Sequence, residues 1–120
     1  MNITHTFTRI AKKAVLLIGE DMNFDGDGKC GEISEYIYDE LNKQGYECDI
    51  IYATGGIIGN ERRQSYTTHI YVFVYKYKLI IDTQLWQINQ QPEDLTKRKC
   101  VFTWEEYNKF FKPTHTEKLT

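Results

Sequence analysis

Two adjacent segments rich in β-branched and aromatic residues constrain the fold of this chain most strongly. Residues 67–76 read TTHIYVFVYK and residues 78–83 read KLIIDT, with a short turn around Lys76 between them. Such composition is typical of β-strands. Both faces of the pair carry large apolar side chains, so we expect an antiparallel hairpin that is buried on both sides.

The segments around this hairpin alternate between helical and extended patterns. Apolar residues at helical spacing predict helices over 7–19 and from Cys30 to about Gly45. Residues 46–53 read as a strand, and the glycines at 55, 56 and 59 are expected to end it. Thr103 and Glu106 form a capping box, which predicts a C-terminal helix that stops before Pro113. The order of these predicted helices and strands indicates an α+β fold, with N-terminal helices packed on an antiparallel sheet and a C-terminal helix.

Length and composition limit the class of protein. The chain has 120 residues, so we expect one domain over 1–112 and a disordered tail over 113–120. The net charge of −2 gives no electrostatic reason to bind nucleic acid or an anionic membrane. No long apolar run is present, which favours a soluble, cytoplasmic protein. We expect Cys48 and Cys100 to be buried thiols and the basic run 97–99 to be solvated.

Cys30, His69 and Asp82 form the constellation with the most chemical meaning. Cys30 begins a predicted helix, His69 lies near the start of the first hairpin strand and Asp82 ends the second. Opposed residues of a hairpin have a constant index sum, and a two- or four-residue turn makes that sum odd. The numbers 69 and 82 add to an odd value, so the two side chains are expected to share a face within hydrogen-bonding reach.

The start of the second helix suits a nucleophilic thiol. The helix dipole and free N–H groups stabilise a thiolate there, so we expect Cys30 to ionise at a lower pH than an ordinary thiol. Gly31 leaves room for a substrate to approach these N–H groups, and Asn23 is a candidate second donor for an oxyanion. Tyr71 lies on the same strand face as His69 and is expected to contact substrate.

The segments GKCGEISEYIYDEL, THIYVFV and LIIDTQ together resemble the transglutaminase-like core of the papain-like superfamily. In that core a cysteine at a helix N-terminus meets a histidine at a strand start and an aspartate on the neighbouring strand. The resemblance covers roughly residues 24–86 and includes the order and spacing of the three residues. It implies that Cys30 is the nucleophile, His69 the base and Asp82 the orienting residue.

The resemblance implies a cysteine-dependent amide or acyl hydrolase, such as a peptidase or deamidase. Its substrate would be a peptide or protein, and no organic cofactor is implied. A non-catalytic interaction protein with the same fold is the first alternative.

A calcium-binding loop is the second alternative. Residues 21–32 match the EF-hand pattern, with Gly26 at the sharp turn. The candidate oxygen ligands are Asp21, Asn23, Asp25, Asp27 and Glu32. Lys29 would place a positive charge near the ion, and the sequence holds no second hand of this kind.

Overall fold

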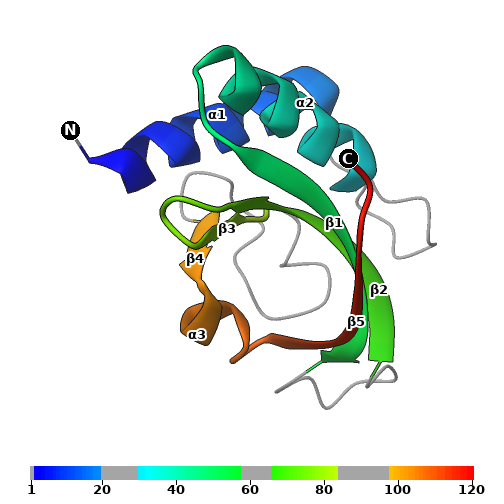
Figure 1. Ribbon diagram of the computed structural model, residues 1–120. Helices are drawn as coiled ribbons and strands as arrows, with labels where there is room; N and C mark the ends of the chain where they lie inside the picture. The colour runs from blue at the N-terminus through cyan, green and yellow to red at the C-terminus, as the bar shows by residue number, and fades with distance from the viewer. Residues whose placement is uncertain (1, 20–29, 58–65, 84–97) are drawn as a thin grey trace.

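The computed structural model describes residues 2–19, 30–57, 66–83 and 98–120, and these form an α+β fold. The elements, in chain order, are α1 (Ile3–Ile18), α2 (Cys30–Lys43), β1 (Cys48–Ile57), β2 (Tyr66–Val74), β3 (Leu79–Ile81), β4 (Val101–Thr103), α3 (Trp104–Tyr107) and β5 (Phe111–Lys118). The strands form one antiparallel sheet in the order β4-β3-β2-β1-β5 (Figure 1). The α+β class and the antiparallel sheet are therefore as predicted.

The two N-terminal helices cover one face of the sheet (Figure 1). Helix α1 begins at Ile3, four residues earlier than predicted, because the Asn2 side chain caps it by accepting the His5 N–H at 3.3 Å. Both helices bury an apolar stripe against the sheet. The buried members of this layer are Phe7, Ala11, Ala14, Val15, Ile33, Ile37 and Leu41 from the helices, Cys48, Ile50, Val72, Val74, Ile81 and Val101 from the strands, and Cys100, which precedes β4.

The opposite face of the sheet carries a second, aromatic-rich core. Its buried members are Ile51, Ala53, Tyr71, Ile80, Phe102, Tyr107 and Phe111. Neighbouring residues such as Tyr71 and Val72 therefore enter different cores, as the alternation of side chains along a strand requires. The prediction that the β2–β3 hairpin is buried on both faces is confirmed.

The prediction of a disordered tail over 113–120 is wrong. Residues Phe111–Lys118 form β5, which pairs with β1 between Ile51 and Ile57. The end of the chain is further held by Asp49, whose carboxylate accepts the Thr120 hydroxyl at 2.6 Å. The segment has little strand propensity of its own, and it is extended because the edge of β1 offers unpaired backbone groups.

The predicted C-terminal helix is present but ends after one turn. The capping box of Thr103 and Glu106 is formed, and the Phe102 and Tyr107 rings meet at 5.7 Å between centroids as a hydrophobic staple. The helix does not extend to Pro113 because Phe111 is already paired with Ile57 in the sheet.

The glycines of β1 do not end that strand, contrary to prediction. The strand continues through Gly55 and Gly56 to Ile57, with a shift of the β1–β5 register between Thr54 and Gly55. At Gly55 an added Cβ would lie 2.6 Å from the Pro113 Cα, so the close approach of β5 requires glycine at this position.

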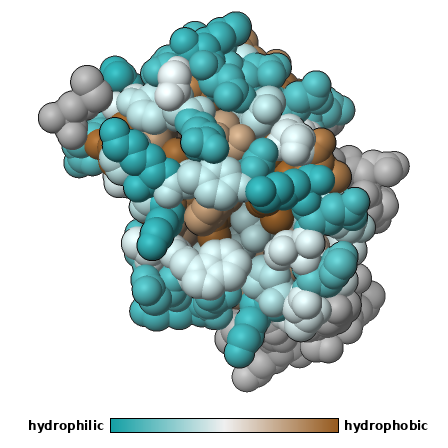
Figure 2. Space-filling model, viewed as in Figure 1, coloured by the Kyte–Doolittle hydropathy of each residue, from teal (hydrophilic) through white to brown (hydrophobic). Residues whose placement is uncertain are grey.

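The surface seen in Figure 2 is mostly hydrophilic, with small apolar areas between the polar side chains. Among the described residues, no helix is both long and apolar enough to cross a membrane.

Candidate active site

The β2–β3 hairpin places His69 and Asp82 on one face of the sheet. Val72 pairs with Ile81 and Val74 with Leu79 across a four-residue turn, so Asp82 follows β3 directly and lies diagonally opposite His69. The His69 Nε2 and Asp82 Oδ2 atoms are 2.8 Å apart. The hydrogen bond that the parity of the hairpin predicted is therefore present.

The carboxylate of Asp82 fixes the tautomer of His69. An ionised carboxylate can only accept hydrogen bonds, so Nε2 of His69 donates and Nδ1 carries the lone pair. Both side chains are buried, with 4% of His69 and 3% of Asp82 exposed. The Asp82 backbone N–H donates to the Cys100 carbonyl at 2.8 Å, which fixes the chain at the carboxylate. The imidazole is thus held in the form that can accept a proton at Nδ1.

Cys30, the first residue of α2, lies beside this pair. Its thiol is half-buried, and the backbone N–H groups of Ile70, Gly31 and Cys30 itself act on the sulfur. A methyl group placed on Gly31 would touch the Ile70 Cδ1 at 3.5 Å, so the start of α2 packs directly against the residue after His69. Asp82 is also close enough for its charge to act on the thiol. The structure therefore places the Cys30 thiol against the residue that follows His69 and within electrostatic reach of Asp82.

The pKa of the Cys30 thiol is raised above its ordinary value of 9.0, opposite to the direction predicted. Burial is the largest cause and the negative charge of Asp82 the second, and together they exceed the opposing effect of the N–H groups. The stabilisation of a thiolate by the helix N-terminus is therefore smaller than the destabilisation caused by burial and by the Asp82 charge. The resting side chain is a neutral thiol at neutral pH.

Aromatic rings support the pair from the second core. The Tyr107 hydroxyl donates to Asp82 Oδ2 at 2.6 Å, and its ring meets those of Tyr71 at 5.2 Å and Phe111 at 6.1 Å. Burial and the charge of Asp82 raise the pKa of both tyrosines, so Tyr107 stays protonated and remains a donor. Tyr71 is only 2% exposed, so it packs behind the site rather than presenting the substrate surface that was predicted.

Two side chains of the site carried no functional prediction. Tyr107 was expected only on the apolar face of a helix. Its hydrogen bond to Asp82 depends on tertiary packing, which no local sequence pattern predicts. Arg98 was expected to be solvated, yet only 3% of it is exposed and it donates to the Thr83 carbonyl at 3.1 Å. It therefore holds the chain next to Asp82. The neighbouring Lys99 is exposed and pairs with Glu106 at 2.5 Å.

Several predicted site residues lie outside the described part of the chain. These are the proposed oxyanion donor Asn23 and the calcium-ligand candidates Asp21, Asp25 and Asp27. Glu32, the last of those candidates, lies in the first turn of α2. Among the described residues, no group of three or more histidine, cysteine or acidic side chains could hold a metal ion.

The other two thiols are buried, as predicted. Cys48 is 5% and Cys100 is 1% exposed, and neither is in a disulfide. Burial, together with the charge of Asp49, raises the pKa of Cys48 from 9.0 to about 11.

These raised thiol pKa values predict a loss of stability at alkaline pH. The folded state holds the Cys48 proton more tightly than the unfolded state, so the contribution is complete below about pH 9 and is lost as the pH rises towards 11. The raised pKa values of Cys30 and Tyr107 also lower the stability of the fold as the pH rises. We expect the urea midpoint of unfolding to fall across this range. The urea midpoint of the Cys48→Ala variant should fall by less over the same pH range. An equal fall would show that Cys48 plays no part in the loss of stability.

Comparison with protein-family models, with curated proteins and with solved structures gave no match.

Proposed function

We propose that this protein is a cysteine-dependent amide or acyl hydrolase with a transglutaminase-like, papain-related core. Cys30 is the nucleophile, His69 the general base and Asp82 the residue that orients the imidazole. The observation that carries the proposal is the buried bond of 2.8 Å between His69 Nε2 and Asp82 Oδ2, made beside a thiol at the start of α2.

The proposed reaction begins with the neutral thiol. As the Cys30 sulfur forms a bond to the substrate carbonyl carbon, its proton passes to His69 Nδ1. The carbonyl oxygen becomes an oxyanion, and the backbone N–H groups around the sulfur, those of Ile70, Gly31 and Cys30, are candidate donors to it. Asp82 stabilises the imidazolium that results.

The second half of the reaction returns the enzyme to its first state. The imidazolium gives its proton to the leaving nitrogen, the carbon–nitrogen bond breaks and a thioester remains on Cys30. A water molecule then loses a proton to His69 Nδ1 as its oxygen attacks the thioester carbon. The carbon–sulfur bond breaks, the sulfur recovers the proton from His69, and a carboxylic acid leaves. The reaction consumes one water and needs no organic cofactor.

The raised thiol pKa favours base-assisted attack over a preformed thiolate. At neutral pH the Cys30 proton must be removed during attack, so His69 is needed for the chemical step. A peptide or protein amide is the substrate class that the fold proposal favours.

Acylation of Cys30 tests the proposal directly. The protein is mixed with p-nitrophenyl acetate, quenched in acid and digested, and each cysteine peptide is examined by mass spectrometry. We expect an acetyl thioester on Cys30, and acylation should slow by at least about 100-fold in His69→Ala. The Cys48→Ala variant is the control and should acylate like the parent. Equal, slow labelling of all three cysteines, or no dependence on His69, would refute the enzyme and favour a non-catalytic interaction protein.

A further inference from the structure

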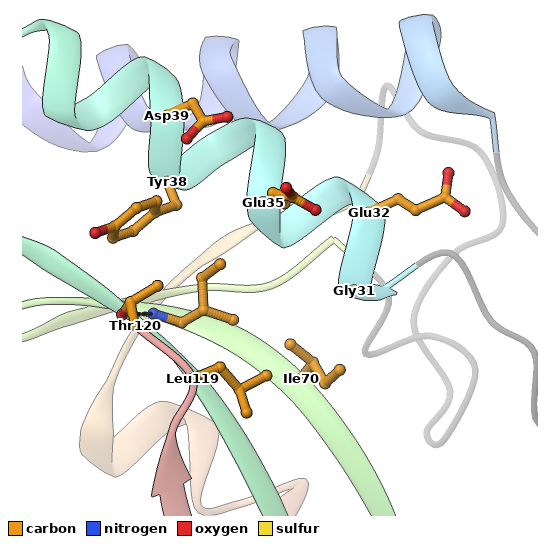
Figure 3. A pocket seen from close by; sticks show the side chains of 9 residues that line it. Gly31, Glu32, Glu35, Tyr38, Asp39, Ile70, Leu119 and Thr120 are labelled. Atoms are coloured by element: carbon orange, nitrogen blue, oxygen red, sulfur yellow. Dashed lines mark hydrogen bonds between the residues drawn. The ribbon is translucent and has the colours of Figure 1, made fainter.

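A groove of about 550 Å³ runs along α2 and begins one residue from Cys30 (Figure 3). Gly31 lines the end nearest the thiol, and Glu35, Tyr38 and Asp39 follow along the helix. The volume lies within the range of about 300–1,000 Å³ that is usual for ligand sites. Cys30 itself does not line the groove, but its chain neighbour Gly31 and Ile70, the residue after His69, both do.

The floor of the groove is apolar, and Leu119 and Thr120 line the side opposite α2. Ile50 lies on β1. Ile70 lies on β2 and Leu119 follows β5 (Figure 3). Leu119 is 52% exposed, so its side chain is available to a bound molecule. An apolar side chain of a ligand would gain free energy by covering Ile70 and Leu119, since Ile50 is already buried.

The helical wall of the groove is acidic. Glu32, Glu35 and Asp39 lie at positions i, i+3 and i+7, which places them on one side of α2. No lysine or arginine is among the described residues that line the groove. Glu35 and Asp39 are exposed, and neither has an ion pair with any residue in the described part of the chain. A cationic ligand is the one that this wall complements.

We propose that this groove binds an extended substrate peptide that carries lysine or arginine beside an apolar residue. The inference rests on the proposed function, because it places the reacting carbonyl at Cys30 and the rest of the peptide along α2. An anionic or purely polar peptide would leave the Glu35 and Asp39 carboxylates without a compensating charge and the apolar floor uncovered.

The dimensions of α2 set the expected positions of the basic side chains. Eight residues separate Gly31 from Asp39, which is about 12 Å along a helix. An extended peptide rises about 3.3 Å per residue, so the groove accommodates three to four residues. A basic side chain about two residues from the reacting carbonyl would meet Glu35, and one about four residues away would meet Asp39.

Peptide binding tests this proposal without requiring turnover. Two fluorescein-labelled peptides, Ala-Leu-Lys-Ala-Lys-Ala and its counterpart with glutamate in place of both lysines, are titrated with the full chain and followed by anisotropy. We expect the lysine peptide to bind at least about five-fold more tightly, with affinity that falls as salt is added. The double variant Glu35→Gln/Asp39→Asn should bind the lysine peptide roughly ten-fold more weakly, which is about three-fold for each charge removed. Glu105→Gln, an exposed acid on α3, removes the same type of charge elsewhere and should bind as the parent does.

The outcomes separate this proposal from the proposed function. Equal binding of the two peptides, or a double variant that behaves like Glu105→Gln, overturns the groove proposal. Acylation of Cys30 by p-nitrophenyl acetate in the parent protein decides the hydrolase proposal independently, since that small ester needs no peptide groove. A chain that acylates but does not distinguish the peptides is a hydrolase with another substrate site. A chain that selects the lysine peptide but does not acylate has the binding groove without the reaction.

Discussion

Replacing Asp82 by asparagine is expected to lower the rate of Cys30 acylation by at least about 100-fold while it lowers the pKa of the Cys30 thiol. The amide has the shape of the carboxylate but no charge, so it cannot stabilise the imidazolium that forms when His69 takes the thiol proton. The same charge raises the thiol pKa in the parent protein, so its removal makes the thiol easier to ionise. Thiolate absorbance against pH measures the pKa, and acylation by p-nitrophenyl acetate measures the rate.

A disturbed fold would also expose the thiol, lower its pKa toward 9.0 and slow the reaction. Circular dichroism and the urea midpoint of unfolding must therefore show that Asp82→Asn is folded as the parent is. Cys48→Ala is the matched control, because its thiol lies in the other core and has no place in the proposed reaction. If Asp82→Asn acylated at the parent rate, Asp82 would have no catalytic role and the proposed triad would be wrong.

The substitution Gly55→Ala is expected to destabilise the protein by about 3 kcal/mol. The new methyl group would meet the Lys112 carbonyl and would lie 2.6 Å from the Pro113 Cα, and both are backbone atoms that a side-chain rotation cannot move away. The strands β1 and β5 would have to separate where their register shifts. Thermal unfolding should report a midpoint lower by roughly 10–15 °C.

Gly31→Ala is the control for adding a methyl group to a glycine. Its methyl would touch the Ile70 Cδ1 at 3.5 Å, which is an ordinary contact, and alanine is favoured over glycine in a helix. We expect this variant to be as stable as the parent or up to about 1 kcal/mol more stable. If the two variants had the same unfolding midpoint, the close approach of β5 to Gly55 would not be present in solution.

The His69–Asp82 pair was accessible to sequence reasoning because hairpin geometry is local. The strands are adjacent in the chain, side chains alternate along each of them, and the four-residue turn makes the register sum odd. Helix α2 was similarly accessible, because its apolar spacing and the glycine after it are local signals. Strand alternation and the turn length therefore suffice to place His69 and Asp82, two of the three proposed catalytic residues, on one face of the sheet.

The rest of the site depends on contacts between distant segments. Tyr107 reaches Asp82 from 25 residues away, and Arg98 reaches Thr83 from beyond a long connection. The pKa of Cys30 could not be inferred from its place at a helix start, because the direction depends on burial and on the distance to Asp82. The strand over Phe111–Lys118 was missed for the same kind of reason, since it is extended only against β1.

The sequence by itself determined the two N-terminal helices, the central hairpin and the common face of His69 and Asp82, because each follows from backbone periodicity over a few residues. Only the tertiary structure decided which segment completes the sheet beside β1, which phenol supports Asp82 and whether the Cys30 thiol rests in its neutral form. Those outcomes depend on pairing, desolvation and charge between segments far apart in the chain, and no local pattern encodes them.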